Sequence, residues 1–313
     1  MKDLRSSERT SLPPAAHPVL LIAVVLGGIA AISCASILIR LADAPPLTVA
    51  AYRVTLAALV VVPVHFTKNI RNHRQAKTLN ARAIRVTLLA GVFLAFHFIL
   101  WISSLSFTSV ASSATLVSTT PIFVAFFSFL FLKAKPSRRL LSAILCTLAG
   151  STVLAGYDGT VSPDAVKGDV LALSGAVMAS GYLIAGRFAR QYLDISSYTA
   201  GAYGTAALVL VPASLITGTP LTGFSHNTYL LLVLIALIPQ LIGHTAFNWS
   251  LRVLSPTQVS LLILGEPVGA TLLAYFVLAE SLTLQRFMGL AILAVGILAG
   301  ASSADSREHG QGT

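Results

Sequence analysis

No Asp, Glu, Lys or Arg occurs between Val86 and Leu132, a stretch of 47 residues. A single helix of that length would be about 70 Å long, whereas the hydrocarbon core of a bilayer is about 30 Å thick. We therefore expect this stretch to cross a membrane twice and to reverse at Ser106–Ser109. A second charge-free stretch of 57 residues, Ile195–Leu251, is expected to break at the polar segment Thr217–Thr228.

The composition supports a membrane protein. Only 10% of the residues are charged and 55% are hydrophobic, whereas soluble domains carry about 25% charged residues. Disorder is excluded, because a disordered chain has low hydrophobicity. The apolar runs lack the alternation of a membrane β-barrel, so the fold class that we predict is all-α integral membrane.

The charge-free runs predict ten transmembrane helices. They cover about residues 19–40, 46–66, 86–106, 109–132, 139–157, 168–188, 195–216, 229–251, 255–279 and 283–301. The first apolar run is too long for a secretory signal and no small-residue cleavage site follows it, so it counts as a helix of the mature chain.

The positions of the basic residues predict the orientation. Of the 21 Lys and Arg, 17 lie on one side of the membrane if the N-terminus is cytoplasmic, and cytoplasmic loops are enriched in these residues. We predict a multi-pass protein of the bacterial plasma membrane, with cytoplasmic tails at 1–18 and 302–313. Because the formal net charge of +10 follows from this bias, no nucleic-acid partner is expected.

The two halves of the sequence repeat each other. Ala57–Pro63 reads AALVVVP and Ala206–Pro212 reads AALVLVP, 149 residues later. His97 and His244 are 147 residues apart, and Pro121 and Pro267 are 146 apart. We predict a first five-helix repeat over 19–157 and a second over 168–301. An odd number of helices inverts the second repeat, as in many secondary transporters.

The segment Leu241–Gly300 carries a family resemblance. It contains Gly-His-Thr-x-Phe-Asn-Trp, Ser-Pro-Thr before a helix, Gly-Glu-Pro-Val-Gly-Ala, and Glu-Ser-Leu-Thr before the last helix. These motifs resemble the ten-helix EamA-type branch of the drug/metabolite transporter superfamily. The resemblance implies two inverted repeats around a central cavity and export of amino acids, metabolites or drugs. The chain departs from the pattern at Lys133–Lys135, where family members often carry an acid resembling Glu280.

Glu266 and Pro267 interrupt the predicted helix 255–279. An ionisable group inside hydrocarbon is costly and normally faces a cavity or a partner, and proline leaves a carbonyl oxygen one turn earlier without its donor. We interpret Glu266 as a site for a proton, a cation or a substrate ammonium. The alternative is a glutamic acid that only ties two helices together. Pro121 is the matching proline, and both prolines are candidate pivots.

Polar residues form a stripe in each half. Gln240, His244 and Asn248 recur every four residues and therefore share one helix face; His97 and Trp101 form a similar stripe. Such a stripe lies inside the bundle, where it lines a wet path or bonds to neighbouring helices, and both interpretations remain open. Imidazole titrates near neutral pH, which would suit proton coupling.

Aromatic and basic residues supply the other candidates. Trp101, Trp249 and Tyr182 are candidate walls of a cavity, because aromatic rings hold apolar and ammonium-bearing solutes; packing or interface anchoring is the alternative. Arg53 is a candidate partner for a substrate carboxylate. Gly296 and Gly300 permit close helix packing within one chain or between two.

The sequence holds no HExxH, GxSxG or P-loop motif, so we predict no enzyme, no cofactor and no metal site. We predict a secondary transporter that exports small organic solutes, such as amino acids or related metabolites, by alternating access. Proton coupling is a further hypothesis. An uncoupled facilitator is the first alternative and an intramembrane enzyme is the less favoured one. The expected partners are a small-molecule substrate and membrane lipid, with the chain a monomer or a homodimer.

Overall fold

The computed structural model describes residues 18–71, 80–108, 110–155, 162–278 and 283–301, and all regular elements in these ranges are helices. Eight helical segments are long and apolar enough to cross a membrane. They are Pro18–Leu41, Pro46–Lys68, Ala81–Ser104, Ser112–Leu132, Pro163–Arg190, Ile195–Ile216, His226–Ser250 and Leu284–Ala301. The prediction of an all-α membrane fold is confirmed at this level.

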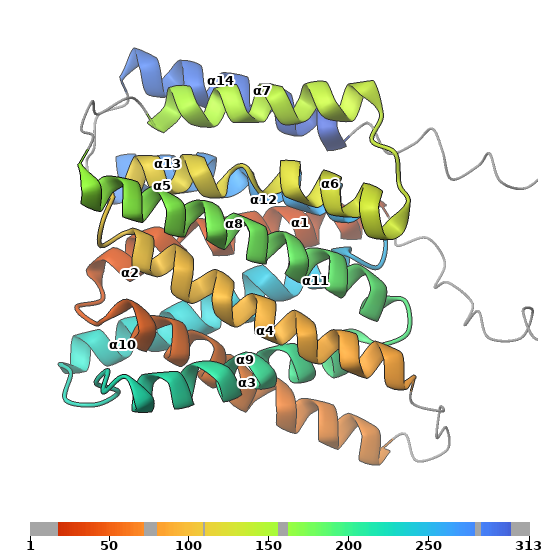
Figure 1. Cartoon of the computed structure of the whole chain (residues 1–313), viewed down its shortest axis with the longest axis vertical. Coiled ribbons are helices and arrows are strands. Elements are labelled where there is room, and N and C mark those ends of the chain that lie inside the picture. Colours follow the sequence, from red (N-terminus) through yellow and green to blue (C-terminus); the bar gives the residue numbers. More distant parts are fainter. Residues whose placement is uncertain (1–17, 72–79, 109, 156–161, 279–282, 302–313) are drawn as a thin grey trace, which may run out of the picture.

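The helices run side by side, so that their connections gather at the two ends of the bundle (Figure 1). The elements are α1 (Pro18–Ser33), α2 (Ala35–Leu41), α3 (Pro46–Arg71), α4 (Ala81–Ser104), α5 (Val110–Val117), α6 (Thr120–Leu132), α7 (Arg138–Ala155), α8 (Pro163–Arg190), α9 (Ile195–Ile216), α10 (His226–Ile235), the π-helical segment η1 (Ala236–His244), α11 (Thr245–Ser250), α12 (Pro256–Ile263), α13 (Gly265–Leu278) and α14 (Leu284–Ala301). Both long charge-free stretches reverse where we expected, after Ser104 and after Ile216.

Capping residues extend two helices beyond the apolar runs. α4 begins at Ala81, because the side chain of Asn80 accepts hydrogen bonds from the backbone nitrogens of Arg82 and Ala83. α8 begins at Pro163, because Ser162 accepts a hydrogen bond from the nitrogen of Ala165. The predicted starts at 86 and 168 were therefore too late, since a cap satisfies the first free N–H groups of a helix.

Four of the predicted continuous helices are interrupted. The helix predicted at 19–40 breaks at Cys34, that at 109–132 at Ser118–Thr119, and that at 255–279 at Leu264. The fourth, predicted at 229–251, contains the π-helical segment η1. Pro121 and Pro267 each follow a break by two or three residues, which is the backbone effect expected of proline.

Two hydrophobic clusters hold the bundle together. The larger is built mainly from α1–α4 and α8–α11. The smaller consists of Ala125, Ala143, Ile144, Leu261, Leu264 and Leu293. α7 and α14 form a pair at the top of Figure 1. A Cβ atom on Gly296 would meet Thr147 of α7, and one on Gly300 would meet Leu261. These glycines therefore pack within the chain.

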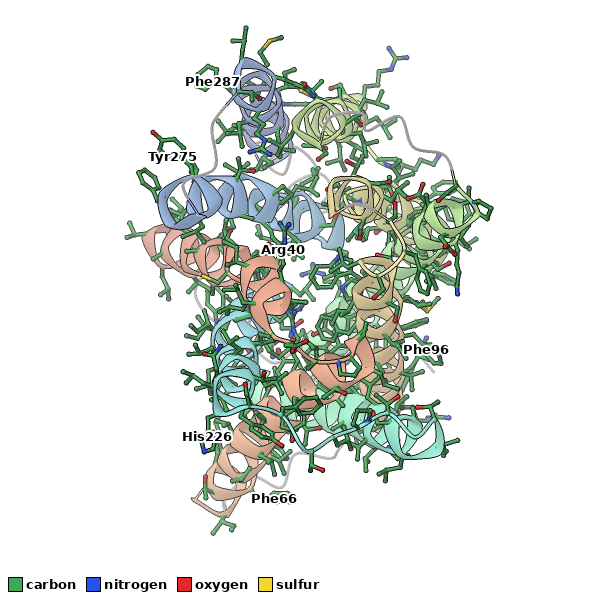
Figure 2. All side chains as sticks on the ribbon, turned by 90° about the vertical axis from the view of Figure 1, so that its left-hand side faces the viewer. Arg40, Phe66, Phe96, His226, Tyr275 and Phe287 are labelled. Atoms are coloured by element: carbon green, nitrogen blue, oxygen red, sulfur yellow. The ribbon has the colours of Figure 1, made fainter. Side chains whose placement is uncertain are left out.

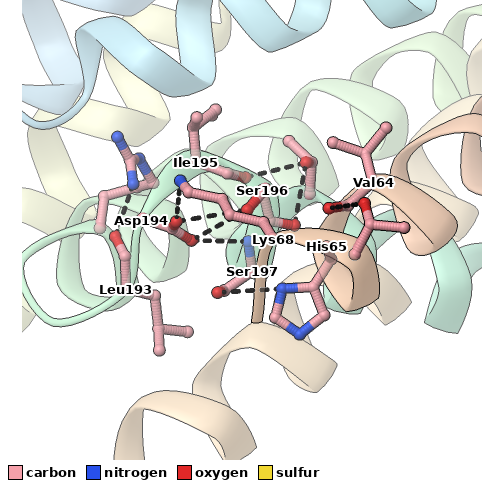
Figure 3. A network of polar contacts seen from close by, with 11 residues as sticks. Val64, His65, Lys68, Leu193, Asp194, Ile195, Ser196 and Ser197 are labelled. Carbon is pink, nitrogen blue, oxygen red and sulfur yellow. Dashed lines mark hydrogen bonds and ion pairs between the residues drawn. The ribbon is translucent and has the colours of Figure 1, made fainter. Parts of the chain in front are cut away.

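A polar network joins α3 to the start of α9 (Figure 3). Lys68 Nζ lies 2.5 Å from Asp194 Oδ2, and the nitrogen of Ser197 donates to Asp194 Oδ1 at 2.8 Å. Partial burial raises the pKa of Asp194, but the hydrogen bonds from Lys68 and Ser197 outweigh it and hold the pKa well below its usual range. Asp194 thus caps α9 as a carboxylate.

We expect Asp194→Asn to lower stability modestly at pH 7, by at most about 1 kcal/mol, because both partners are partly exposed and asparagine still caps a helix well. A depressed pKa contributes stability above the unfolded value of about 3.9 and loses it as the pH falls below that value. The difference in melting temperature between wild type and variant should therefore shrink from pH 6 towards pH 3. A difference that grows on acidification would contradict this account.

Candidate functional site

A cavity of about 1360 Å³ lies inside the bundle. Its walls come from helices of both halves of the chain, including α2, α3, α4, α8, α11 and α13. At one end its lining includes Arg40, Pro46, Ser106 and Arg286, which lie at or beside the connections α2–α3, α4–α5 and α13–α14. Figure 2 looks onto this end and shows Arg40 near the centre of the bundle. The cavity is large enough for a small organic molecule.

The cavity collects most of the residues that the sequence predicted. Its lining includes His97, Trp101, Tyr182, His244, Asn248, Arg53, Glu266 and Pro267. These residues come from six different elements, so no single helix carries the candidate site. The arrangement brings a basic and an acidic side chain, two imidazoles and aromatic rings to one cavity.

Arg53 is held in the wall by α3. Its side chain is only 1% exposed. Nε donates a hydrogen bond of 2.8 Å to Gln240 Oε1, and Cζ lies 4.2 Å from the centre of the Phe98 ring. The cation–π contact with Phe98 and the hydrogen bond to Gln240 hold the guanidinium in one orientation.

His97 is oriented by two contacts. Its Nδ1 lies 2.9 Å from the carbonyl oxygen of Gly175 in α8, and its ring stacks on Trp101 with 5.9 Å between centroids and 5° between planes. Because a carbonyl oxygen only accepts, we assign a proton to Nδ1. His97 and Trp101 therefore line the cavity as a stacked pair of rings.

His244 faces the same cavity from η1. Its ring meets that of Phe98 edge-on, with 5.4 Å between centroids and 76° between planes. Phe98 thus contacts both His244 and the guanidinium of Arg53. The two histidines that recur in the sequence repeat both line this cavity.

Asn248 forms part of the cavity lining together with Tyr182. Its Oδ1 accepts a hydrogen bond of 2.8 Å from the Tyr182 hydroxyl, and its Nδ2 donates to the Tyr203 hydroxyl at 3.2 Å. Tyr203 also lies 3.1 Å from Thr245 Oγ1. The oxygen and the nitrogen of the Asn248 side-chain amide are therefore both hydrogen-bonded to buried side chains, which fixes the position of the amide.

Glu266 stands in the first turn of α13, just after the break at Leu264. The Ser33 hydroxyl lies 3.3 Å from the backbone oxygen of Glu266 and ties α13 to the end of α1. The Glu266 side chain lines the cavity. The other helix break, between α5 and α6, also borders it through Ser118 and Thr120.

Two arginines at the end of α8 bind the chain at the opposite end of the bundle. Arg190, which is 2% exposed, donates from Nε to the carbonyl oxygen of Asn248 at 3.1 Å. Arg187 donates from Nη1 to the carbonyl oxygens of Leu251 and Leu254. Basic side chains of this kind satisfy the free carbonyl groups at the end of a helix. Neither arginine lines the cavity, so the cavity ends before this region.

Three predicted site residues lie outside the cavity lining. Gln240 is fully buried, and its Oε1 accepts the hydrogen bond from Arg53 Nε. Trp249 follows Asn248 by one residue and so points about 100° away from it. Pro121 is buried beside the break before α6. Direct contact of Gln240 and Trp249 with a substrate therefore stays a prediction, since neither residue lines the cavity.

Sequence reasoning missed three contributors. Phe98 contacts Arg53 and His244, yet one phenylalanine among 15 carries no distinguishing signal. Arg40 and Arg286 line the mouth of the cavity. Their position beside the external end of predicted helices was the available signal, although it is shared with residues that anchor a helix at the interface. No group of three or more His, Cys, Asp or Glu in the described ranges could hold a metal ion.

The EamA-like transporter family matches the chain over residues 17–156 and 166–299. The chain belongs to this family. As an EamA-like transporter with eight candidate spans, it is a multi-pass membrane protein, and the resemblance seen in the sequence is confirmed.

Two relatives are described only as uncharacterized transporters. One, from Archaeoglobus fulgidus, is 26% identical over 250 residues, which cover 77% of this chain and 83% of the relative. The other, from Clostridium kluyveri, is 23% identical and covers 64% and 66%. The crystal structure of a protein with 19% identity has the same fold, with a TM-score of 0.75 over 91% of this chain and 98% of that one.

Proposed function

We propose that this EamA-like protein is a secondary transporter that exports small organic solutes, such as amino acids or related metabolites, across the bacterial plasma membrane. The observation that carries the proposal is the cavity of about 1360 Å³, which holds Glu266, His97 and His244 inside an apolar bundle. Ionisable groups inside a membrane bundle mark substrate and ion pathways. A scaffold or receptor would have no need of such a space.

The proposed architecture is ten membrane spans in two inverted repeats, 19–157 and 168–301. The two family matches, at 17–156 and 166–299, support this division. The breaks before Pro121 and Pro267 fall at equivalent places in the two halves, and both border the cavity. We assign these breaks as pivots for alternating access, in which one repeat moves against the other.

The proposed orientation places the cavity mouth outside the cell. The mouth lies beside the α2–α3 and α4–α5 connections, which carry far fewer Lys and Arg than the other end of the bundle. The conformation is then outward-facing, and Arg187 and Arg190 close the cytoplasmic side. Both tails, 1–18 and 302–313, are proposed to be cytoplasmic, and almost all of their residues lie outside the described ranges.

Flux into proteoliposomes tests the proposal. We expect the purified protein to move at least one radiolabelled solute from a panel of amino acids and organic acids, above the rate in protein-free liposomes. An imposed pH gradient should change that rate if the protein couples flux to protons; an unchanged rate would favour an uncoupled facilitator. Absence of flux for the whole panel, with chemical conversion of a solute seen by mass spectrometry, would instead favour an intramembrane enzyme.

A further inference from the structure

The guanidinium of Arg53 has hydrogen-bonding capacity that the protein does not use. Nε is paired with Gln240, whereas Nη1 is buried and has no hydrogen-bond partner in the described ranges. A buried donor without a partner costs about 1–3 kcal/mol, and more when it is charged. Arg53 nevertheless lies in the wall of a cavity, where a bound solute could supply the missing acceptor.

The neighbours of Arg53 favour a planar, negatively charged acceptor. The guanidinium lies over the Phe98 ring, with 4.2 Å between Cζ and the ring centre, and Nη1 remains a donor without a partner. The edge of a guanidinium pairs with a carboxylate through two parallel hydrogen bonds. Gln240 is neutral, so its bond to Nε orients the group without cancelling its charge.

The charges around the cavity agree with this preference. Three arginines, Arg40, Arg53 and Arg286, line it, against one acidic residue, Glu266. No ion pair within 4.0 Å joins Arg53 to Glu266. The wall therefore carries an excess of formal positive charge, and a cleft lined by one sign of charge concentrates ligands of the other sign.

We propose that the solutes of this cavity carry a carboxylate and that this carboxylate binds Arg53. Gln240 is a positioning residue, which orients the guanidinium from η1 through its bond to Nε. The inference rests on the proposed transport function for its biological meaning. It is a statement about binding, however, and binding can be measured without transport.

Matched pairs of probes test the inference on the wild-type protein. Thermal shift of the purified full-length chain is measured with 3-phenylpropionate against its primary amide, and with phenylalanine, leucine and glutamine against the corresponding amino acid amides. We expect at least one carboxylate to stabilise the protein with an affinity about tenfold or more above that of its amide, equivalent to about 1.4 kcal/mol. Equal binding of both members of every pair, or stabilisation by no carboxylate, overturns the inference.

Gln240→Glu gives the sharpest variant. It keeps the size of the side chain and an acceptor for Nε of Arg53, but it neutralises the guanidinium. We expect carboxylate affinity to fall about tenfold while affinity for the amide does not fall, a change in selectivity that a merely structural role would not produce. Unchanged carboxylate selectivity in this variant would overturn the inference. Should the variant not fold, the wild-type pairs still decide.

Two further variants complete the experiment. Gln191→Glu makes the same chemical change at an exposed position at the end of α8. It should leave the preference for carboxylate over amide unchanged. Arg53→Lys keeps the charge but loses the planar pair of donors, so the carboxylate should bind more weakly and still bind better than the amide. Carboxylate binding without any flux would leave this inference standing and remove the transport proposal. Flux of amides without preference for carboxylates would support the transport proposal and overturn this inference.

Discussion

Replacing Glu266 with glutamine is expected to reduce solute flux about tenfold or more, because a hydrogen bond to a charged group contributes about 1.5–3 kcal/mol. Glu266 is the acidic residue that lines the cavity. It stands at a helix break, where the backbone can change direction. Glutamine keeps the shape of the side chain and removes both its negative charge and its ability to carry a proton.

Two readouts separate the roles of Glu266. If it carries a coupled proton, flux driven by a pH gradient should fall while exchange of labelled for unlabelled solute persists. If it binds the solute, both should fall. Asp43→Asn is the matched control, because it removes an exposed carboxylate from the α2–α3 connection outside the cavity lining. Normal flux in a folded Glu266→Gln variant would remove Glu266 from the proposed site.

The histidine of the second repeat is tested in the same assay. His244→Ala removes a ring that lines the cavity and contacts Phe98, so we expect flux to decrease with it. His226→Ala is its control, because His226 is exposed at the start of α10 (Figure 2). Equal flux in the two variants would show that the imidazole of His244 has no part in transport.

Replacing Gly150 with alanine is expected to destabilise the protein by about 1–3 kcal/mol, the usual cost of forcing extra atoms into a packed core. α7 and α14 approach so closely that a Cβ atom on Gly150 would lie 2.5 Å from the backbone nitrogen of Leu293. Backbone atoms cannot rotate aside as a flexible side chain can. The opposite contact, between Gly289 and the backbone of Leu154, is equally tight.

Gly27→Ala provides the matched comparison. A Cβ atom there meets nothing within 4 Å, and alanine favours a helix over glycine by about 1 kcal/mol. The melting temperature should therefore fall for Gly150→Ala and stay level or rise for Gly27→Ala. A Gly150→Ala protein as stable as wild type would show that α7 and α14 can separate without loss of stability.

The helical framework could be predicted because it depends on hydrophobicity over long windows. Charge-free runs located the reversals after Ser104 and Ile216, and the prolines at 121 and 267 indicated where helices open. The exact ends depend on single capping side chains such as Asn80 and Ser162. Those residues lie outside the apolar runs, so hydropathy does not predict where these two helices begin.

The candidate site was predictable only in part. Buried ionisable groups such as Glu266 and His244 stand out, because their cost in hydrocarbon demands a reason. The pairing of Arg53 with Gln240 joins residues 187 positions apart, so no local pattern in the sequence indicates it. Phe98 was invisible for a related reason, since its importance comes from what it touches rather than from its type.

Asn248 connects the cavity with the contacts made by Arg190. Its side chain lines the cavity and bonds to Tyr182, while its backbone carbonyl oxygen accepts a hydrogen bond from Nε of Arg190. We expect that a bound solute which draws the Asn248 amide away from Tyr182 also weakens the hydrogen bond between Arg190 and the Asn248 carbonyl oxygen. Binding of a solute in the cavity and release of the Arg190 contact would then be coupled through Asn248.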